Sequence, residues 1–149
     1  KTFTQVTSDK LLHNMLVNVV GPSLIAKHFL PALRSDRKTV FAALSARVGS
    51  ISDNQLGGWY SYRASKAALN MMIKTFSVEL KRVQPQTVIV GLHPGTVDTG
   101  LSKPFQRNVA PNKLFAREHS AGCLLNVIEK LTLDDSGYCF AWDGQRIAE

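Results

Sequence analysis

The chain has 149 residues, 44% of them hydrophobic, which is enough for one domain with an ordinary buried core. Its net charge is +7, but the basic residues are scattered, and Arg37-Lys38 and Lys81-Arg82 are the only adjacent pairs. No aromatic residues interleave with basic ones as in a nucleic-acid-binding surface. We therefore expect a solvated basic surface or an anionic ligand, and no nucleic acid.

Two further classes are excluded as expectations. The sequence has no run of about 18 apolar residues, so we expect no transmembrane helix. It also does not open with the charged and then apolar segments of a signal peptide. Cys123 and Cys139 lack the Cys-x-x-Cys spacing and are interpreted as reduced thiols rather than a redox or metal pair. The sequence thus predicts a cytoplasmic protein with no membrane partner and no metal.

The first half of the chain predicts helix, strand and helix in that order. Apolar spacing indicates a helix from Ser8 to Leu33, which Gly21-Pro22 should kink or restart. The continuous apolar run Thr39–Leu44 is typical of a strand buried on both faces of a parallel sheet. A polar loop from Ser45 to Trp59 precedes a helix from Tyr62 to about Arg82.

The second half repeats this alternation. Thr87–Leu92 is a second buried strand, which His93-Pro94-Gly95 ends. The segment 101–113 is irregular, 117–131 is helical, and 137–142 is a last strand before an Asp143-Gly144 turn. Strands that alternate with helices predict an α/β domain with right-handed crossovers and a parallel sheet.

The strongest chemical signal is Tyr62-x-x-x-Lys66 at the start of an alanine-rich helical run. Residues four apart lie on one helix face, so this spacing places a phenol beside an ammonium group. A neighbouring positive charge favours the phenolate and lowers the tyrosine pKa from about 10. Such a tyrosine can exchange a proton with a carbonyl or alcohol oxygen, although the pattern alone also fits a surface Tyr and Lys.

The residues around this pair resemble the short-chain dehydrogenase/reductase family. Four stretches carry the resemblance in the family's order: Asn18-Val19-Val20-Gly21, Leu44-Ser45-Ala46-Arg47-Val48-Gly49-Ser50-Ile51, Tyr62-Arg63-Ala64-Ser65-Lys66-Ala67-Ala68-Leu69-Asn70 and His93-Pro94-Gly95-Thr96-Val97-Asp98-Thr99. The resemblance covers nearly the whole chain. Within the family it is similar to the subgroup of the C-factor signalling protein and the sniffer-type carbonyl reductases.

The resemblance implies a catalytic set. Tyr62 is the general acid/base, and Lys66 lowers its pKa and bonds the nicotinamide ribose. Asn18 bends its helix and holds a proton-relay water against the lysine; the alternative is an incidental polar residue in an apolar helix. The segment Pro94-Gly95-Thr96-Val97-Asp98-Thr99 contacts the nicotinamide end, with Val97 offering its N–H and Thr99 its hydroxyl. The alternative for that segment is a simple turn.

The serine of the family's set is uncertain, because the second serine position is Ala46. Ser45 is the nearest hydroxyl and Ser50 lies farther along the loop, so either could serve. Adjacent residues of a strand point to opposite sides, so Ser45 is not a free substitute for position 46. Ser45 is equally expected to satisfy loop backbone alone.

Three side chains near these motifs carry weaker predictions. His93 precedes a proline at a strand end and is predicted to be structural rather than catalytic. Trp59 and Phe105 either line a substrate opening or pack in the core.

The family's Gly-x-x-x-Gly-x-Gly turn, which binds the cofactor pyrophosphate at a helix N-terminus, is absent from this sequence. By resemblance, residues 1–149 form a single domain, the carboxyl-terminal catalytic part of a partial Rossmann-like, doubly wound parallel sheet. This part comprises the last three strands and their helices, without the Gly-rich amino-terminal half. Thr39–Leu44 should therefore lie at a sheet edge in this chain, because the strand that the family places beside it belongs to the absent half.

Two functions follow. The first is an NAD(P)-dependent oxidoreductase, with NADP favoured, acting on a small carbonyl or alcohol substrate. The second is a non-catalytic signalling or protein-interaction module derived from such a reductase. The resemblance also implies a homo-oligomer formed through the helices that bear Asn18 and Tyr62.

Overall fold

A computed structural model describes residues 2–33 and 36–149, apart from the side chains of Phe105, Asn108 and Pro111. Three parallel strands form the central sheet in the order β1-β2-β5: β1 (Thr39–Leu44), β2 (Thr87–His93) and β5 (Cys139–Ala141). A separate pair of short parallel strands joins β3 (Thr96–Val97) to β4 (Leu114–Phe115). The predicted α/β class and the three-stranded parallel sheet are confirmed.

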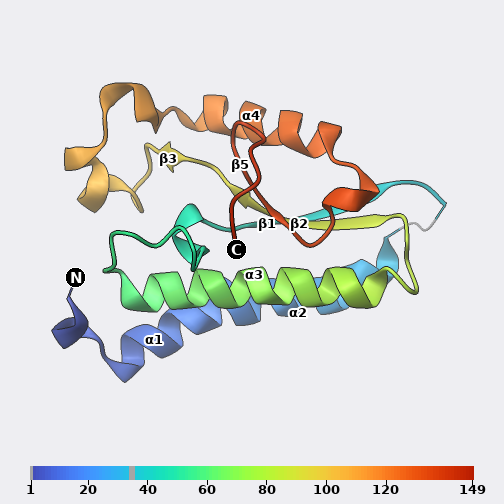
Figure 1. The fold of residues 1–149 in the computed structure, drawn as a ribbon, viewed down its shortest axis with the longest axis horizontal. Coiled ribbons are helices and arrows are strands. Elements are labelled where there is room, and N and C mark those ends of the chain that lie inside the picture. Colours follow the sequence, from blue (N-terminus) through green and yellow to red (C-terminus); the bar gives the residue numbers. More distant parts are fainter. Residues whose placement is uncertain (1, 34–35) are drawn as a thin grey trace.

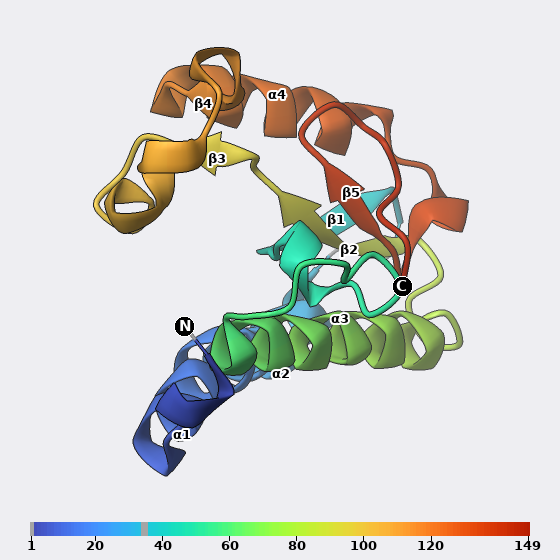
Figure 2. The same ribbon diagram turned by 60° about the vertical axis from the view of Figure 1, so that its left-hand side comes forward.

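Helices cover both faces of the central sheet (Figure 1). On one face lie α1 (Ser8–Met15), α2 (Gly21–Phe29) and the long α3 (Tyr60–Leu80); α4 (Arg117–Lys130) lies on the other. Figure 2 shows α1 and α2 running beside α3, while β3, β4 and α4 form the opposite side. Short 3₁₀ turns complete the fold at Phe3–Gln5, Leu30–Ala32, Arg47–Gly49, Lys103–Asn108, Pro111–Lys113 and Leu133–Asp135.

The alternation of β2 divides the core into two clusters. Ile89 packs toward α3, with Ala26, Leu30, Ala43, Leu69 and Ile73. Val88, Val90 and Leu92 pack toward α4, with Val127, Leu131 and Phe140. Because both faces of β2 are covered, this strand is buried along almost its whole length, as its continuous apolar run predicts.

β1 lies at the sheet edge that is expected for it in this chain. The strand has the predicted bounds, it is the edge of the described sheet, and Leu44 is 61% exposed. The burial on both faces that the apolar pattern favours is therefore absent among the described residues, whereas the expected edge position is present. An apolar run of this kind normally lies inside a sheet, and at an edge it leaves backbone groups open to another strand.

The first long helix is interrupted by a π turn at Leu16–Val20, and this turn contains Asn18. Pro22 has no N–H to donate to the carbonyl of Asn18 four residues earlier. The Gly21 N–H instead bonds the carbonyl of Leu16, five residues earlier. The predicted restart of the helix at Gly21-Pro22 is confirmed, because α2 begins at Gly21 directly after the π turn.

The helical run Ser8–Ala32 also meets the length and composition of a membrane-spanning helix, with a mean hydropathy of 1.2 and only 11% of that window buried. The sequence expectation that no segment would qualify was therefore too strict. A helix that packs against another protein surface has the same composition, and α1 lies along α3 (Figure 2). This property alone is weak support for a membrane location.

We predict that Gly91→Ala destabilises the fold by about 1–3 kcal/mol, because the inserted methyl overpacks the core. A Cβ at Gly91 would lie 2.4 Å from Cys139 Sγ and 3.2 Å from Ile73 Cδ1. Gly100→Ala is the matched control, since no heavy atom lies within 4 Å of its Cβ position. Urea unfolding measures both, and the control should stay within about 0.5 kcal/mol of the parent. Equal free energies for the two variants would contradict the packing of β2 against β5.

Candidate active site

One cavity of about 940 Å³ lies at the carboxyl ends of β1 and β2. Its walls come from the amino-terminal segment with α1, the end of β1 and its loop, the start of α3, the segment after β2, and the first turns of α4. Ligands of open α/β sheets bind at the carboxyl ends of the strands. The position of this cavity therefore makes it the candidate active site.

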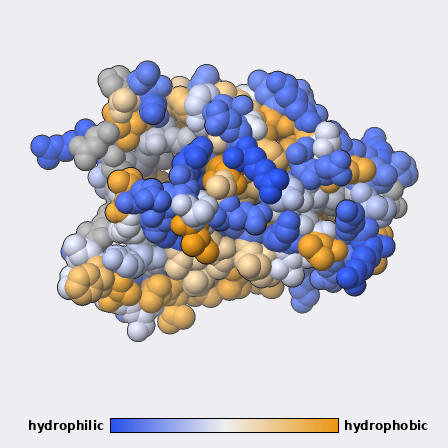
Figure 3. Space-filling view, viewed as in Figure 1, coloured by the Kyte–Doolittle hydropathy of each residue, from blue (hydrophilic) through white to orange (hydrophobic). Residues whose placement is uncertain are grey.

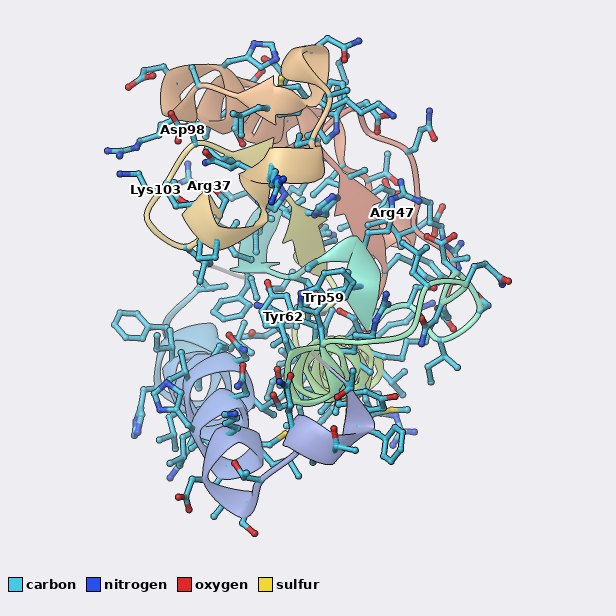
Figure 4. The ribbon with its side chains drawn as sticks, turned by 90° about the vertical axis from the view of Figure 1, so that its left-hand side faces the viewer. Arg37, Arg47, Trp59, Tyr62, Asp98 and Lys103 are labelled. Carbon is cyan, nitrogen blue, oxygen red and sulfur yellow. The ribbon has the colours of Figure 1, made fainter. Side chains whose placement is uncertain are left out.

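Tyr62 lies in the first turn of α3 and lines the cavity. Figure 4 shows Tyr62 beside Trp59, at the end of α3 that faces the β3 side of the molecule. Trp59 has a left-handed backbone (φ 49°) and follows two positive-φ glycines, Gly57 and Gly58. The Arg63 side chain bonds the carbonyls of both glycines at 3.2 and 3.1 Å. These contacts set the point at which α3 begins, and hence the position of Tyr62.

Lys66 lies one turn deeper and is only 7% exposed. Its Nζ donates to the carbonyl of Leu44 at 2.9 Å and lies 5.7 Å from the centroid of the Tyr62 ring. The predicted proximity of phenol and ammonium is therefore present, but Lys66 is not among the residues that line the cavity. The hydrogen bond to Leu44, at the end of β1, holds the ammonium group outside the cavity lining.

The pKa directions differ from the sequence expectation. Burial raises the pKa of Tyr62 above 10.0, whereas the spacing alone predicted a lowered value. Burial also lowers the pKa of Lys66 below 10.5. Desolvation disfavours the charged form of both groups. Tyr62 is thus a protonated phenol at neutral pH, the form that can donate a proton.

Asn18 reaches α3 but not the cavity. Its Nδ2 donates to Ser65 Oγ at 3.0 Å, and the Ser65 hydroxyl bonds the carbonyl of Tyr62 at 2.9 Å. Ser65 is fully buried and directly precedes Lys66. Asn18 therefore contacts α3 between Tyr62 and Lys66, and its role with a relay water stays a prediction.

The two serines of the loop after β1, Ser45 and Ser50, already form hydrogen bonds within the protein. Ser45 lines the cavity, but its Oγ donates to Asn70 Oδ1 at 2.6 Å, and Cys139 Sγ donates to the same oxygen at 3.1 Å. Ser50 Oγ accepts from the Asp53 N–H at 3.1 Å. Ala46, which also lines the cavity, supplies no polar atom from its side chain. Both serines are thus engaged within the fold.

The segment after β2 lies on the other side of the cavity, which is lined by Pro94, Gly95, Thr96, Val97 and Thr99. Sequence patterns predict no strand here, but Thr96–Val97 forms β3 because β4 pairs with it. Gly95 has φ 78°, and a Cβ there would lie 2.6 Å from the Phe115 ring. Only glycine fits this close approach of the turn to β4.

Sequence reasoning missed the polar residues that hold this segment. Ser120 Oγ donates to the carbonyl of Pro94 at 2.8 Å, and Ser102 Oγ bonds the carbonyl of Val97 and accepts from the Thr99 N–H. Asn70, which binds Ser45, was also missed. Serine and asparagine in irregular or helical segments carry no signal of their partners, because these contacts join residues distant in the sequence or depend on the shape of the turn.

The cavity is electropositive. Lys10, Arg47 and Arg117 line it, and no aspartate or glutamate does so among the residues that the structure describes. Arg47 is partly neutralised by Asp53, at 3.3 Å, in a pair that is about half exposed. Trp59 also lines the cavity, as one reading of the sequence predicted, whereas the Phe105 side chain lies outside the described part.

The fold and this cavity define a dehydrogenase-type α/β protein, and comparison with known proteins identifies the family. The family model for short chain dehydrogenase matches residues 1–110. The C-signal protein of Myxococcus xanthus is 35% identical over 131 residues, covering 88% of this chain and 74% of that protein. This chain belongs to the short-chain dehydrogenase family.

Solved structures show the same similarity. The carbonyl reductase Sniffer of D. melanogaster matches with a TM-score of 0.85 and 31% identity, and the NADPH-bound carbonyl reductase from chicken fatty liver with a TM-score of 0.85 and 28% identity. Each match covers 100% of this chain and 61% of the solved chain. The chain thus spans about three-fifths of the length of these reductases.

His93 yields a prediction about stability and pH. Burial and the charge of Arg47 lower its pKa to about 4, against 6.5 in an unfolded chain. Between these values the unfolded state binds a proton that the folded state does not, so stability falls as the pH drops from 6.5 to about 4. Denaturant unfolding across this range should show a smaller loss for His93→Gln. Identical pH profiles for the two proteins would contradict a buried, neutral His93.

Proposed function

We propose that the protein is an NAD(P)-dependent oxidoreductase, with NADP favoured, that interconverts a small carbonyl compound and its alcohol. The observation that carries the proposal is the position of Tyr62, which lines one cavity together with the Pro94–Thr99 segment at the carboxyl edge of the sheet. The family supplies the general class, and the Sniffer and chicken carbonyl reductases support the carbonyl substrate. The chicken structure, which holds NADPH, supports the cofactor.

The residues present fit the nicotinamide end of such a cofactor. The cavity is large enough for a nicotinamide riboside and a small substrate, and Thr96, Val97 and Thr99 line it. Lys66 can bind a ribose hydroxyl if its ammonium turns from the Leu44 carbonyl toward the cavity. Lys10, Arg47 and Arg117 suit a ligand that carries negative charge.

The chemistry assigned to the chain is proton transfer and positioning. A reduced nicotinamide, when bound, supplies a hydride to the carbonyl carbon. Tyr62 donates its phenolic proton to the carbonyl oxygen, and its raised pKa keeps that proton in place until the oxygen becomes basic. Lys66 then stabilises the phenolate that forms, because its ammonium lies on the same helix face. In the oxidative direction the same groups act in reverse.

The pyrophosphate and adenosine of the cofactor need residues that this sequence does not contain. The family's Gly-rich turn is absent from these 149 residues, and the matched reductases are longer. We infer that the chain corresponds to the carboxyl-terminal catalytic part of such a reductase. Binding energy from the remote phosphates positions the reacting ring, so turnover requires that segment as well.

The apolar face of α1 and α2 supports self-association. Leu12, Leu16, Val20, Leu24 and Phe29 are each 42–63% exposed. Figure 3 shows apolar residues gathered along the lower edge of the molecule, where Figure 1 places these helices. A contiguous apolar surface of this kind is typical of an interface. The proposed assembly is a homo-oligomer joined through α1, α2 and α3, located in the cytoplasm.

The second candidate function is a non-catalytic signalling or interaction module. One observation favours it: β1 is an open edge of the described sheet, next to exposed Leu44. An open edge accepts a strand from another chain. The similarity to a protein named C-signal points the same way. NADPH binding separates the two candidates, because the module has no need of it.

We predict that Tyr62→Phe lowers carbonyl turnover by about 10²–10⁴-fold in the full-length protein, because the proton donor is lost. The ring stays in place, so the midpoint of thermal unfolding and the Kd for NADPH should not change. Tyr138→Phe is the matched control, since Tyr138 is outside the cavity. A Tyr62→Phe enzyme that keeps half of its turnover would contradict the assignment.

We also predict that Leu16→Glu shifts the protein toward the monomer, because a buried carboxylate at an apolar interface is costly. Leu125→Glu on α4 is the control: the two leucines are 59% and 60% exposed, but only Leu16 belongs to the apolar face of α1 and α2. Sedimentation velocity measures the association. If both variants sediment like the parent, the interface lies elsewhere.

A further inference from the structure

Position 46, which the family resemblance assigns to a hydroxyl that binds the carbonyl oxygen of a substrate, is an alanine in this chain. Ala46 lines the cavity without a polar side-chain atom. Ser45 donates to Asn70, and Ser50 is bonded within its own loop. A reaction that places negative charge on an oxygen gains from a fixed donor besides the acid that protonates it.

His93 is placed to provide that donor. His93 is the last residue of β2 and lies beside the carboxyl end of β1. There, Leu44 pairs with Leu92, and the Ser45 N–H donates to the Leu92 carbonyl at 2.8 Å. Side chains alternate along β2, so His93 lies on the same face as Gly91 and Ile89, which is the face that packs against α3. His93, Ala46 and Tyr62 all line the one cavity.

The ring nitrogens of His93 are not equivalent. Nδ1 is buried and has no hydrogen-bond partner among the residues that the structure describes. A proton on Nδ1 would leave a buried N–H without an acceptor, so the neutral ring carries its proton on Nε2. Burial and Arg47 hold the pKa near 4, against the opposing effect of Asp143, so the ring is neutral at pH 7. It therefore presents one N–H and no charge.

We propose that His93 is a further catalytic residue, whose Nε2–H donates a hydrogen bond to the carbonyl oxygen of the substrate in place of the serine hydroxyl missing at Ala46. This inference rests on the proposed function. The proton transferred to the oxygen still comes from Tyr62, and His93 keeps its own proton throughout. Its contribution is to stabilise charge on the oxygen while the hydride arrives at the carbon.

The first test is kinetic and includes a rescue. His93→Phe should lower kcat in the full-length protein by about 10²-fold, the usual cost of one lost donor at an oxyanion, with the Kd for NADPH unchanged. Adding Ala46→Ser to His93→Phe should restore at least about tenfold, because it returns a hydroxyl to the same place. A purely structural histidine would not be rescued this way. His119→Phe, an exposed histidine on α4, is the control and should keep the parent kcat.

The second test does not depend on turnover. In protein labelled with ¹⁵N in its histidine rings, an alcohol or ketone added with NADP should shift the Nε2 resonance of His93 and leave those of His119 in place. If His93→Phe fails to fold, His93→Gln serves, since its amide retains a donor and should keep more activity than His93→Ala.

The outcomes are distinguishable. The role of His93 is overturned if the parent binds NADPH and turns over, but the kcat of His93→Phe lies within about twofold of the parent value. It is also overturned if Ala46→Ser does not restore the lost kcat. Either result leaves the proposed function intact. No NADPH binding by the parent protein overturns both. Loss of kcat, rescue and the Nε2 shift together establish the assignment.

Discussion

The site depends on the close approach of α3 to the turn that follows β1. A Cβ at Gly49 would lie 2.8 Å from the backbone carbon of Lys66, so only glycine allows the helix to pack there. Lys66 Nζ closes the contact through the carbonyl of Leu44, and Arg63 Nη1 adds a bond to the carbonyl of Val48 at 3.2 Å. These three contacts place Tyr62 at the carboxyl ends of β1 and β2, where it lines the cavity.

The same packing decides the electrostatics. Because α3 is pressed against β1, Lys66 is removed from water and Tyr62 is partly desolvated, so both favour their neutral forms. The neutral imidazole of His93 follows from the same burial. Lys10, Arg47 and Arg117 bring positive charge to the cavity wall, while Tyr62 and His93 line the same cavity as neutral groups that carry a proton. This division suits the reduction of a carbonyl group in the presence of an anionic cofactor.

Much of this arrangement follows from sequence patterns that are local. The bounds of β1 are those of its apolar run between polar neighbours, and the helix that begins near Tyr62 follows from its composition and from Pro85. Tyr62 and the Pro94–Thr99 segment could be assigned to the site because each belongs to a short sequence motif. The interruption of the helix at Pro22 could be predicted because the missing N–H acts within one helical turn.

What the sequence did not reveal depends on contacts between distant residues. β3 and β4 have two residues each, and either is a strand only because the other lies beside it. The hydroxyl of Ser45 is directed by Asn70, which lies on another element. The pKa of Tyr62 follows burial more than the neighbouring charge, and burial is a property of the packed fold.

The central claim is that this cavity brings a nicotinamide and a carbonyl group together beside Tyr62. The most direct measurement uses NADPH carrying deuterium at the reactive carbon of the nicotinamide, the full-length protein and an aromatic aldehyde, with mass spectrometry of the alcohol product. With both hydrogens at that carbon replaced by deuterium, we expect one deuterium at the carbinol carbon. An alcohol without deuterium, or no alcohol although NADPH is bound, would contradict the claim.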